Sequence, residues 1–186
     1  IRLKLLGDVV DYFVIVQSAQ TFTGKSSKLN FPTSGELIEC YRDKIRLITL
    51  ESLDGDDAWA RESFSRNAMS QGLTDAGDTD LIMISDVDEL SRPEVLARVK
   101  RDGVNSPVTL VLDYFNFKFN YKLMVGLDTY WAGPVLAQAS KFAGAQAARD
   151  SRWKNMDRQG GCIFDAGWHF SYITATGDIS IKLASF

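Results

Sequence analysis

The sequence predicts an α/β fold in a single domain. Short apolar runs rich in β-branched residues alternate with segments whose apolar residues recur at helical spacing, and this alternation is typical of α/β proteins. The chain has 186 residues, of which 45% are hydrophobic, so it can enclose a substantial core. It contains no internal repeat, low-complexity tract or linker that would divide it.

Two strands and a short helix are predicted first. The run at 9–18 is β-branched and aromatic over a length typical of a buried strand, and the run at 45–50 has the same character. A loop containing Gly and Ser follows the first run. The segment ELIECYRDK at 36–44 then predicts about two helical turns.

A longer helix is predicted within residues 56–73. Ala60, Phe64 and Ala68 recur at four-residue spacing, which places them on one face of a helix. An Asp at the start of the segment and Gly72 near its end are typical of the two termini of a helix.

The next segments predict a strand at 80–85, DLIMIS, and a helix at 93–101, PEVLARVKR. Pro93 favours the first position of that helix, where a backbone N–H would have no partner inside the helix. The apolar stretch at 107–121 predicts one long strand or a hairpin. Beyond about residue 122 the pattern becomes irregular.

Composition excludes several classes of function. The formal net charge is −3 and the Lys and Arg residues form no basic block, so we expect no nucleic-acid partner. Cys40 and Cys162 show neither CxxC spacing nor a His cluster, which argues against a zinc site or a disulfide framework and favours a reducing compartment. No run approaches the ~18 apolar residues that span a bilayer, so we expect no transmembrane segment in this chain.

The segment LIMISDVDEL, residues 81–90, runs from an apolar strand directly into three carboxylates. In open α/β sheets, ligands gather at the carboxyl ends of strands, where Asp86, Asp88 and Glu89 stand. Two aspartates separated by one residue face the same point if the chain bends there, and their hard oxygens suit Mg²⁺ or Mn²⁺. The alternative is that the strand ends in acidic residues because the chain has reached water.

Three metal-site templates can be compared with this segment. An EF-hand would require further oxygen ligands and a Gly at fixed offsets, which ISDVDELSRPEV lacks. A phosphatase of the haloacid dehalogenase type also carries DxD after an apolar strand, but it usually continues with Thr or Val where this chain has Leu90. The DxD of glycosyltransferases, which holds a metal against the diphosphate of a sugar nucleotide, has no local misfit.

A second motif, AQTFTGKS at 19–26, has only a superficial likeness to a phosphate-binding P-loop. The P-loop has Gly where Ala19 stands, and a long helix should follow where this chain has Pro32. We therefore do not predict an NTPase. The residues around Lys25 form either a loop near a nucleotide or a turn with a solvated Lys.

Five segments of the chain match one family in order and in spacing. They are 8–31, RNAMSQGL at 66–73, DLIMISDVDELSRPEVL at 80–96, AGWHFSYI at 166–173 and KLASF at 182–186. These segments resemble glycosyltransferase family 17, which includes the β-1,4-mannosyl-glycoprotein β-1,4-N-acetylglucosaminyltransferase as well as many bacterial members. The resemblance implies a GT-A-like fold with a mostly parallel central sheet flanked by helices, a nucleotide-sugar donor, a divalent metal and inversion at the anomeric carbon.

Relative to that family, the chain begins after an expected first strand and stops at Phe186, where members usually continue. We therefore expect a single glycosyltransferase domain, 1–186, truncated at both ends. The absence of a leader and the low cysteine count favour a cytoplasmic enzyme of bacterial type that acts in polysaccharide biosynthesis. A full-length eukaryotic homologue would be lumenal and membrane-anchored.

The resemblance also implies roles for residues near the metal. Asp88 is expected to bind Mn²⁺ or Mg²⁺ directly, and Asp86 to bind the donor's hydroxyls or to reach the metal through water. His169, the only histidine, is a metal ligand, a base, or a buried residue with its hydrogen bonds satisfied. Glu89 binds donor or supports the loop, or is a solvated carboxylate.

Other residues are expected to bind substrate or to catalyse. Arg66 and Asn67 match the family's RNA tripeptide and are expected to reach the donor, as is Lys25; as ordinary surface residues they would have no such role. Trp168 is expected to stack on a sugar, and Trp131 is a second candidate, although both also suit core packing. Asp165 is the expected catalytic base, with Asp113 and Glu89 as rivals.

The function expected from the sequence is therefore metal-dependent, inverting transfer of a sugar to a glycan hydroxyl, with N-acetylglucosamine from UDP-GlcNAc as the expected donor. The alternatives are a DxD phosphohydrolase with Asp86 as nucleophile, and a noncatalytic module that binds a nucleotide sugar.

Overall fold

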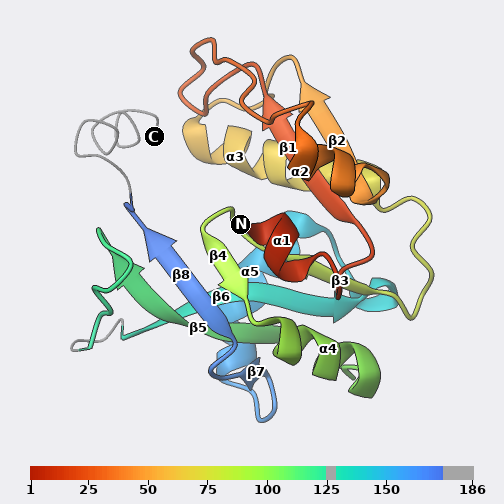
Figure 1. Cartoon of the computed structure of the whole chain (residues 1–186), viewed down its shortest axis with the longest axis vertical. Coiled ribbons are helices and arrows are strands. Elements are labelled where there is room, and N and C mark those ends of the chain that lie inside the picture. Colours follow the sequence, from red (N-terminus) through yellow and green to blue (C-terminus); the bar gives the residue numbers. More distant parts are fainter. Residues whose placement is uncertain (125–128, 174–186) are drawn as a thin grey trace. The chain divides into compact units, whose positions relative to one another are not determined.

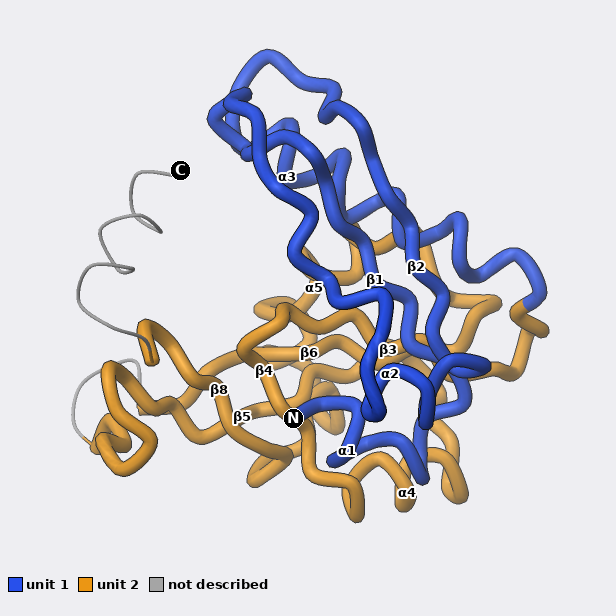
Figure 2. Tube along the Cα trace, turned by 45° about the horizontal axis from the view of Figure 1, so that its top comes forward, with its two compact units in different colours: residues 1–75, 176–186 blue, residues 76–175 orange. Residues whose placement is uncertain are grey.

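The computed structural model describes residues 1–124 and 129–173. The described residues divide at Asp75 into two compact units, 1–75 and 76–173 (Figure 2). Compact units of this size also occur inside one domain, so the single domain expected from the sequence stays a prediction.

The unit of residues 1–75 is built on two parallel strands. Strand β1 (Phe13–Ser18) pairs with β2 (Ile45–Leu50), with Phe13 opposite Ile45 and Ser18 opposite Leu50. Both predicted strands are therefore confirmed. The unit also contains three α-helices and two short 3₁₀ helices: α1 (Arg2–Leu6), α2 (Glu36–Cys40), η1 (Arg42–Lys44), α3 (Ala58–Asn67) and η2 (Ala68–Gly72).

Both ends of the predicted helix at 56–73 have a local cause. The side chain of Asp57 caps α3 by accepting a hydrogen bond of 2.8 Å from the backbone N–H of Ala60. At the other end, Gly72 lies against β1, and a Cβ atom there would be 2.6 Å from a methyl carbon of Val14. The absent side chain therefore lets the end of η2 approach the strand.

The unit of residues 76–173 contains a mixed sheet and two α-helices (Figure 1). The order of its main strands across the sheet is β3-β6-β5-β8-β4, and β7 pairs with β5 beside β8. The elements are β3 (Leu81–Ile84), β4 (Glu89–Ser91), α4 (Pro93–Asp102), β5 (Val108–Asn116), β6 (Tyr130–Gln138), η3 (Ala139–Lys141), α5 (Ala145–Met156), β7 (Cys162–Ile163) and β8 (Gly167–Ser171).

The expectation of a mostly parallel central sheet is wrong. The pairs β3–β6, β5–β6 and β4–β8 are antiparallel, whereas β5 pairs with β7 and with β8 in parallel. The fold class is still α/β. Periodicity marks where strands occur but does not encode which strands pair, and β5 and β6 are consecutive strands whose described connecting residues contain no helix.

Beyond residue 122, where the sequence pattern is irregular and predicts no elements, the structure contains regular ones, including β6, α5 and β8. Strand β6 contains Gly133 and Pro134, residues that normally interrupt a strand. The pairing with β5 shifts register between Thr109 and Val111, opposite these two residues. The pairing of β6 with β3 begins only at Val135. Pro134 therefore lies where β6 pairs regularly with neither β3 nor β5.

The two helices of this unit pack in different ways. Helix α4 begins at Pro93, as predicted, and buries three apolar side chains, those of Val95, Leu96 and Val99. Helix α5 contacts β3, β5 and β6 through small residues, and its buried side chains include Ala145 and Ala148. The close approach of α5 to the sheet brings its arginines near the strands. The core of this unit includes Leu110, Val111, Leu112 and Val135, each at most 1% exposed.

Candidate active site

The acidic segment forms a turn between β3 and β4. The backbone N–H of Glu89 donates a hydrogen bond of 3.2 Å to the carbonyl oxygen of Asp86, which closes the turn. The side chains of Asp86 and Asp88 are 28% and 25% exposed, whereas Val87 between them is 90% exposed. The two aspartates are therefore partly enclosed by protein, and the residue between them projects into solvent.

Glu89 lies beneath this turn with only 2% of its surface exposed. Its Oε1 accepts a hydrogen bond of 2.6 Å from Trp131 Nε1, and its Oε2 accepts one of 2.8 Å from the backbone N–H of Asp86. Ser85 Oγ also lies 3.3 Å from Oε2. The carboxylate of Glu89 thus ties the turn to β6.

The same burial changes the acidity of Glu89. Loss of hydration, followed by the negative charge of Asp86, raises the pKa of Glu89 from 4.5 to about 7. The hydrogen bonds from Trp131 and from the backbone of Asp86, and the charge of Arg149, act in the opposite direction and are outweighed.

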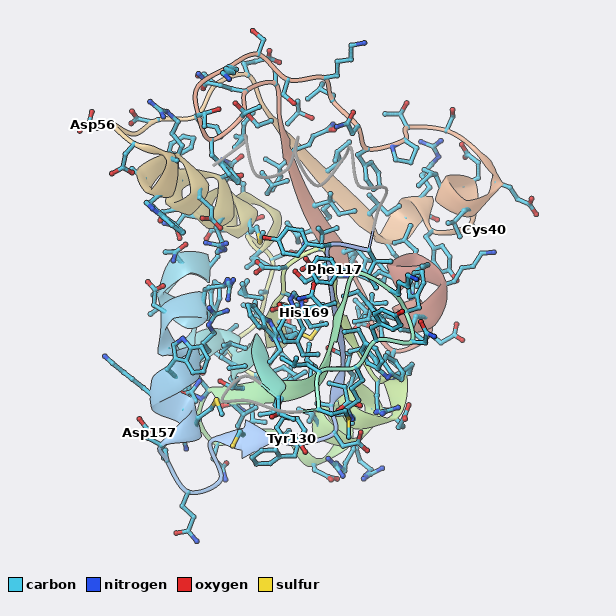
Figure 3. All side chains as sticks on the ribbon, turned by 90° about the vertical axis from the view of Figure 1, so that its left-hand side faces the viewer. Cys40, Asp56, Phe117, Tyr130, Asp157 and His169 are labelled. Carbon is cyan, nitrogen blue, oxygen red and sulfur yellow. The ribbon has the colours of Figure 1, made fainter. Side chains whose placement is uncertain are left out.

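His169 comes from β8 and lies beside Asp88. In the antiparallel β4–β8 pair, Glu89 stands opposite His169, and the N–H of Phe170 donates to the carbonyl oxygen of Asp88 at 2.9 Å. The His169 Nδ1 atom is 3.6 Å from Asp88 Oδ1. Figure 3 shows His169 enclosed by other side chains, and its exposed fraction is 4%.

Aromatic contacts fix the His169 ring. It stacks on Trp131 with ring centroids 4.1 Å apart and an interplanar angle of 10°, and Tyr114 lies 5.1 Å away. The guanidinium carbon of Arg152 lies 5.3 Å from the Trp131 ring centroid. Trp131 is thus held in place by His169, Arg152 and Glu89.

Arg149 of α5 completes the cluster around the acidic turn. Its Nη2 atom is 2.5 Å from Asp86 Oδ2, and the Arg149 side chain is 16% exposed. Sequence reasoning missed this residue because no helix was predicted over 145–156. The segment AQAARDSRWKNM has small residues where most helices have large apolar ones, so its pattern carries little helical signal.

The cluster fits a divalent metal in part. A metal ion binds oxygen and nitrogen ligands at about 2.0–2.6 Å, so two ligand atoms of one ion lie roughly 3–4 Å apart. The 3.6 Å between Asp88 Oδ1 and His169 Nδ1 falls in this range. Asp86 is paired with Arg149, and among residues 1–124 and 129–173 no three acidic, His or Cys side chains already converge as a metal site.

Asp165 and Trp168 lie away from this cluster. Asp165 has a positive φ of 50° and an exposed side chain, and its carboxylate accepts a hydrogen bond of 2.8 Å from Arg92 Nη2. Arg92 follows β4, whereas Asp88 precedes it, and four residues of strand span about 13 Å. The structure therefore places Asp165 at the opposite end of β4 from Asp88.

Trp168 pairs with Leu90 and directly precedes His169 on β8. Successive strand residues face opposite sides of a sheet, so the Trp168 ring lies on the other side from His169. The Arg92 guanidinium covers this ring at 4.3 Å from its centroid. The structure thus groups Trp168 with Asp165 and Arg92.

Three further predicted residues belong to the unit of residues 1–75. Lys25 is exposed in a turn in which its carbonyl oxygen accepts a 2.8 Å hydrogen bond from the N–H of Thr21. Arg66 is 9% exposed and forms an ion pair of 2.5 Å with Glu62, and Asn67 is the last residue of α3. The structure groups these residues with β1 and α3. The predicted KLASF segment lies outside the described residues.

The same unit contains a cavity at the carboxyl end of β1. Its volume is about 250 Å³. Its lining residues come from β1, the following loop and α3: Val16, Gln17, Ser18, Gln20, Thr21, Phe22 and Ser65.

The family model for glycosyltransferase family 17 matches residues 1–186, the whole chain. The chain belongs to glycosyltransferase family 17. It is therefore a glycosyltransferase, an enzyme that moves a sugar from a donor to an acceptor. Comparisons with curated proteins and with solved structures found no significant match.

The acidic turn joins β3 to β4, and β4 pairs with β8. The turn therefore lies close to five polar side chains, those of Asp86, Asp88, Glu89, Arg149 and His169. In the described part of the glycosyltransferase, no helix has the length and apolar character required to cross a membrane.

Proposed function

We propose that this glycosyltransferase inverts the anomeric carbon of a nucleotide sugar as it transfers the sugar to a glycan hydroxyl, with a divalent metal held at the acidic turn. The observation that carries the proposal is the approach of Asp88 to His169, with Nδ1 and Oδ1 3.6 Å apart beside Asp86. Two potential ligands from segments far apart in the sequence meet at one point, and Asp86 of the same turn provides a second carboxylate.

The residues proposed to hold Mn²⁺ or Mg²⁺ are Asp88, His169 and Asp86. When bound, the metal neutralises charge that grows on the leaving diphosphate. Glu89 holds the turn in shape for this purpose, because its carboxylate binds both the Asp86 backbone and Trp131. Arg149 adds a positive charge to the same cluster.

The proposed donor is UDP-GlcNAc and the proposed linkage is β. Within the unit of residues 1–75, the cavity at the end of β1 is a candidate for the nucleoside, because it lies at the carboxyl end of a parallel strand and Gln17, Gln20 and Thr21 are among its lining residues. Lys25, Arg66 and Asn67 remain the proposed donor contacts from this unit. The enclosed ion pair of Arg66 with Glu62 supports a role in shaping α3 as well.

Asp165 remains the proposed base. In an inverting transfer the acceptor oxygen attacks from the side of the sugar opposite the diphosphate, so the base stands apart from the metal. The separation of Asp165 from Asp88 meets that requirement, and the ion pair with Arg92 orients the Asp165 carboxylate. Asp113, which pairs with Lys122 at 2.7 Å, and Glu89 are the rival carboxylates.

The proposal is tested by incubating the protein with UDP-GlcNAc and Mn²⁺, with and without oligosaccharide acceptors, and following release of UDP. We expect release that EDTA abolishes and that Asp88→Asn lowers by at least about 100-fold. Asp102→Asn, which changes an exposed carboxylate paired with Arg101 on α4, is the matched control and should retain wild-type turnover.

Two outcomes would replace the proposal. Release of phosphate from phosphate monoesters, without turnover of any nucleotide sugar, would indicate a DxD phosphohydrolase. Metal-independent turnover of UDP-GlcNAc, unaffected by Asp88→Asn, would show that the protein transfers the sugar without a metal at Asp88.

A further inference from the structure

Arg149 and Asp86 form an ion pair at the place where we propose that a metal binds. The Nη2–Oδ2 distance is 2.5 Å, and both side chains are mostly enclosed. A guanidinium and a divalent cation cannot both bind one carboxylate closely without repelling each other. Metal binding by Asp86 therefore competes with Arg149.

The rest of the Arg149 guanidinium has few partners. Its Nε and Nη1 atoms are buried, and no described residue accepts a hydrogen bond from either. Buried N–H groups without acceptors are unfavourable, so the ion pair with Asp86 is what holds Arg149 in this position. An Arg that loses its carboxylate in such a place retains donors for another anion.

Arg152, three residues further along α5, provides a contrast. Its guanidinium lies against the rings of Trp131 and Trp153, each 5.3 Å from the centroid. Aromatic rings thus hold Arg152 in place, whereas a carboxylate of the acidic turn holds Arg149. Of the two, Arg149 is the one whose partner would be taken by a metal.

We propose that Arg149 exchanges partners when the donor binds: it leaves Asp86, which turns to the metal, and binds a phosphate oxygen of the donor's diphosphate. This inference rests on the proposed function. A diphosphate carries enough negative charge for both cations, so their repulsion is relieved only when it is present. Arg149 thereby makes metal binding and diphosphate binding interdependent.

The test is calorimetric titration of the whole chain, first with Mn²⁺ alone and then with inorganic pyrophosphate at saturating Mn²⁺. In Arg149→Met, Mn²⁺ alone should bind about tenfold more tightly, because Asp86 is released, and pyrophosphate should bind about tenfold more weakly. The matched control is Arg101→Met, which removes an exposed Arg paired with Asp102, and it should change neither affinity.

The opposite directions of the two changes separate this exchange from damage to the fold, which would weaken both affinities. Arg149→Lys is a second variant that keeps the charge and loses the fork of donors; it should weaken pyrophosphate binding while Mn²⁺ alone binds as in wild type. If Arg149→Met does not fold, the measurements on Arg149→Lys test the proposal instead.

Unchanged affinities in Arg149→Met, or weaker binding of Mn²⁺ alone, would overturn the exchange and leave the proposed function standing. Failure of the wild-type chain to bind pyrophosphate with Mn²⁺ would also overturn the exchange. Turnover of UDP-GlcNAc, measured separately, then shows whether the proposed function stands.

Discussion

The indole N–H of Trp131 donates a hydrogen bond of 2.6 Å to the buried carboxylate of Glu89. This bond joins β6 to the acidic turn, since the other oxygen of Glu89 accepts from the backbone of Asp86. The position of the turn therefore depends on a side chain that follows it by more than 40 residues.

The first prediction concerns this hydrogen bond. Trp131→Phe keeps a ring for His169 to stack on but leaves Glu89 Oε1 without its donor, so we expect the free energy of unfolding to fall by roughly 1–3 kcal/mol. Urea denaturation measures this change. Trp153→Phe, at an exposed position on α5, is the control and should stay within about 0.5 kcal/mol of wild type. Equal effects of both variants would contradict a special role for the bond.

The second prediction concerns pH. Burial raises the pKa of Glu89 to about 7, so between pH 4.5 and 7 the folded protein holds a proton at Glu89 that the unfolded chain releases. The free energy of unfolding should therefore fall as pH rises through this window, by roughly 3 kcal/mol at most, and level off above it.

Glu89→Gln should remove this component. Urea denaturation from pH 4.5 to 8 in EDTA, compared between wild type and variant, isolates the contribution of Glu89. Glu94→Gln, which changes an exposed carboxylate in the first turn of α4, should keep the wild-type slope. A Glu89→Gln variant with the same slope as wild type would show that Glu89 titrates normally.

The third prediction concerns the contact between β4 and β8. A Cβ atom on Gly167 would lie 2.0 Å from the carbonyl oxygen of Leu90, and the φ of Gly167 is 153°. Gly167→Ala must push two backbones apart, so we expect a loss of more than about 2 kcal/mol in unfolding free energy, measured by thermal or urea denaturation.

A second glycine separates the effect of steric crowding from the effect of a left-handed backbone. Gly160 has a φ of 70°, but a Cβ atom there would have nothing within 4 Å. Gly160→Ala should therefore cost only about 1 kcal/mol, the cost of the left-handed backbone. If the two variants lose the same stability, close approach of the strands is not what requires Gly167.

The fourth prediction concerns His169 as a ligand. His169→Gln removes the imidazole nitrogen that lies 3.6 Å from Asp88 Oδ1, so we expect Mn²⁺ affinity to fall by at least about tenfold. Calorimetric titration measures it directly, without turnover. Tyr114→Phe keeps the ring against His169 and should bind Mn²⁺ as wild type does. Unchanged Mn²⁺ affinity in His169→Gln would show that His169 is a buried residue that does not coordinate the metal.

Local sequence signals predicted the elements that depend on local chemistry. The run at 45–50 is β2, Pro93 begins α4, and the Asp57 cap begins α3, because strand propensity, a fixed φ and a capping side chain act within a few residues. The turn with Asp86 and Asp88 was also visible, since polar residues directly follow an apolar strand.

Features that depend on long-range packing were not visible in the pattern. Strand β6 contains a Gly and a Pro that are tolerated because its pairing with β5 is irregular there. Helix α5 has a face of small residues, Ala145 and Ala148, that suits close contact with a sheet but gives weak periodicity. Arg149 was missed with its helix. The meeting of His169 with Asp88 followed from family resemblance, because no local pattern links them.

The order of synthesis has a consequence for when this site can exist. Asp88 and His169 are separated by 81 residues, and β8 is placed between β5 and β4 although it is made after both. At about 5–20 residues per second, a ribosome needs roughly 4–16 s to pass from one residue to the other. During that interval the nascent chain has the acidic turn without the histidine, and the sheet has a gap where β8 will insert. The residues that we propose hold the metal are therefore joined only after β8 has been made, so a chain released before β8 lacks the pair entirely.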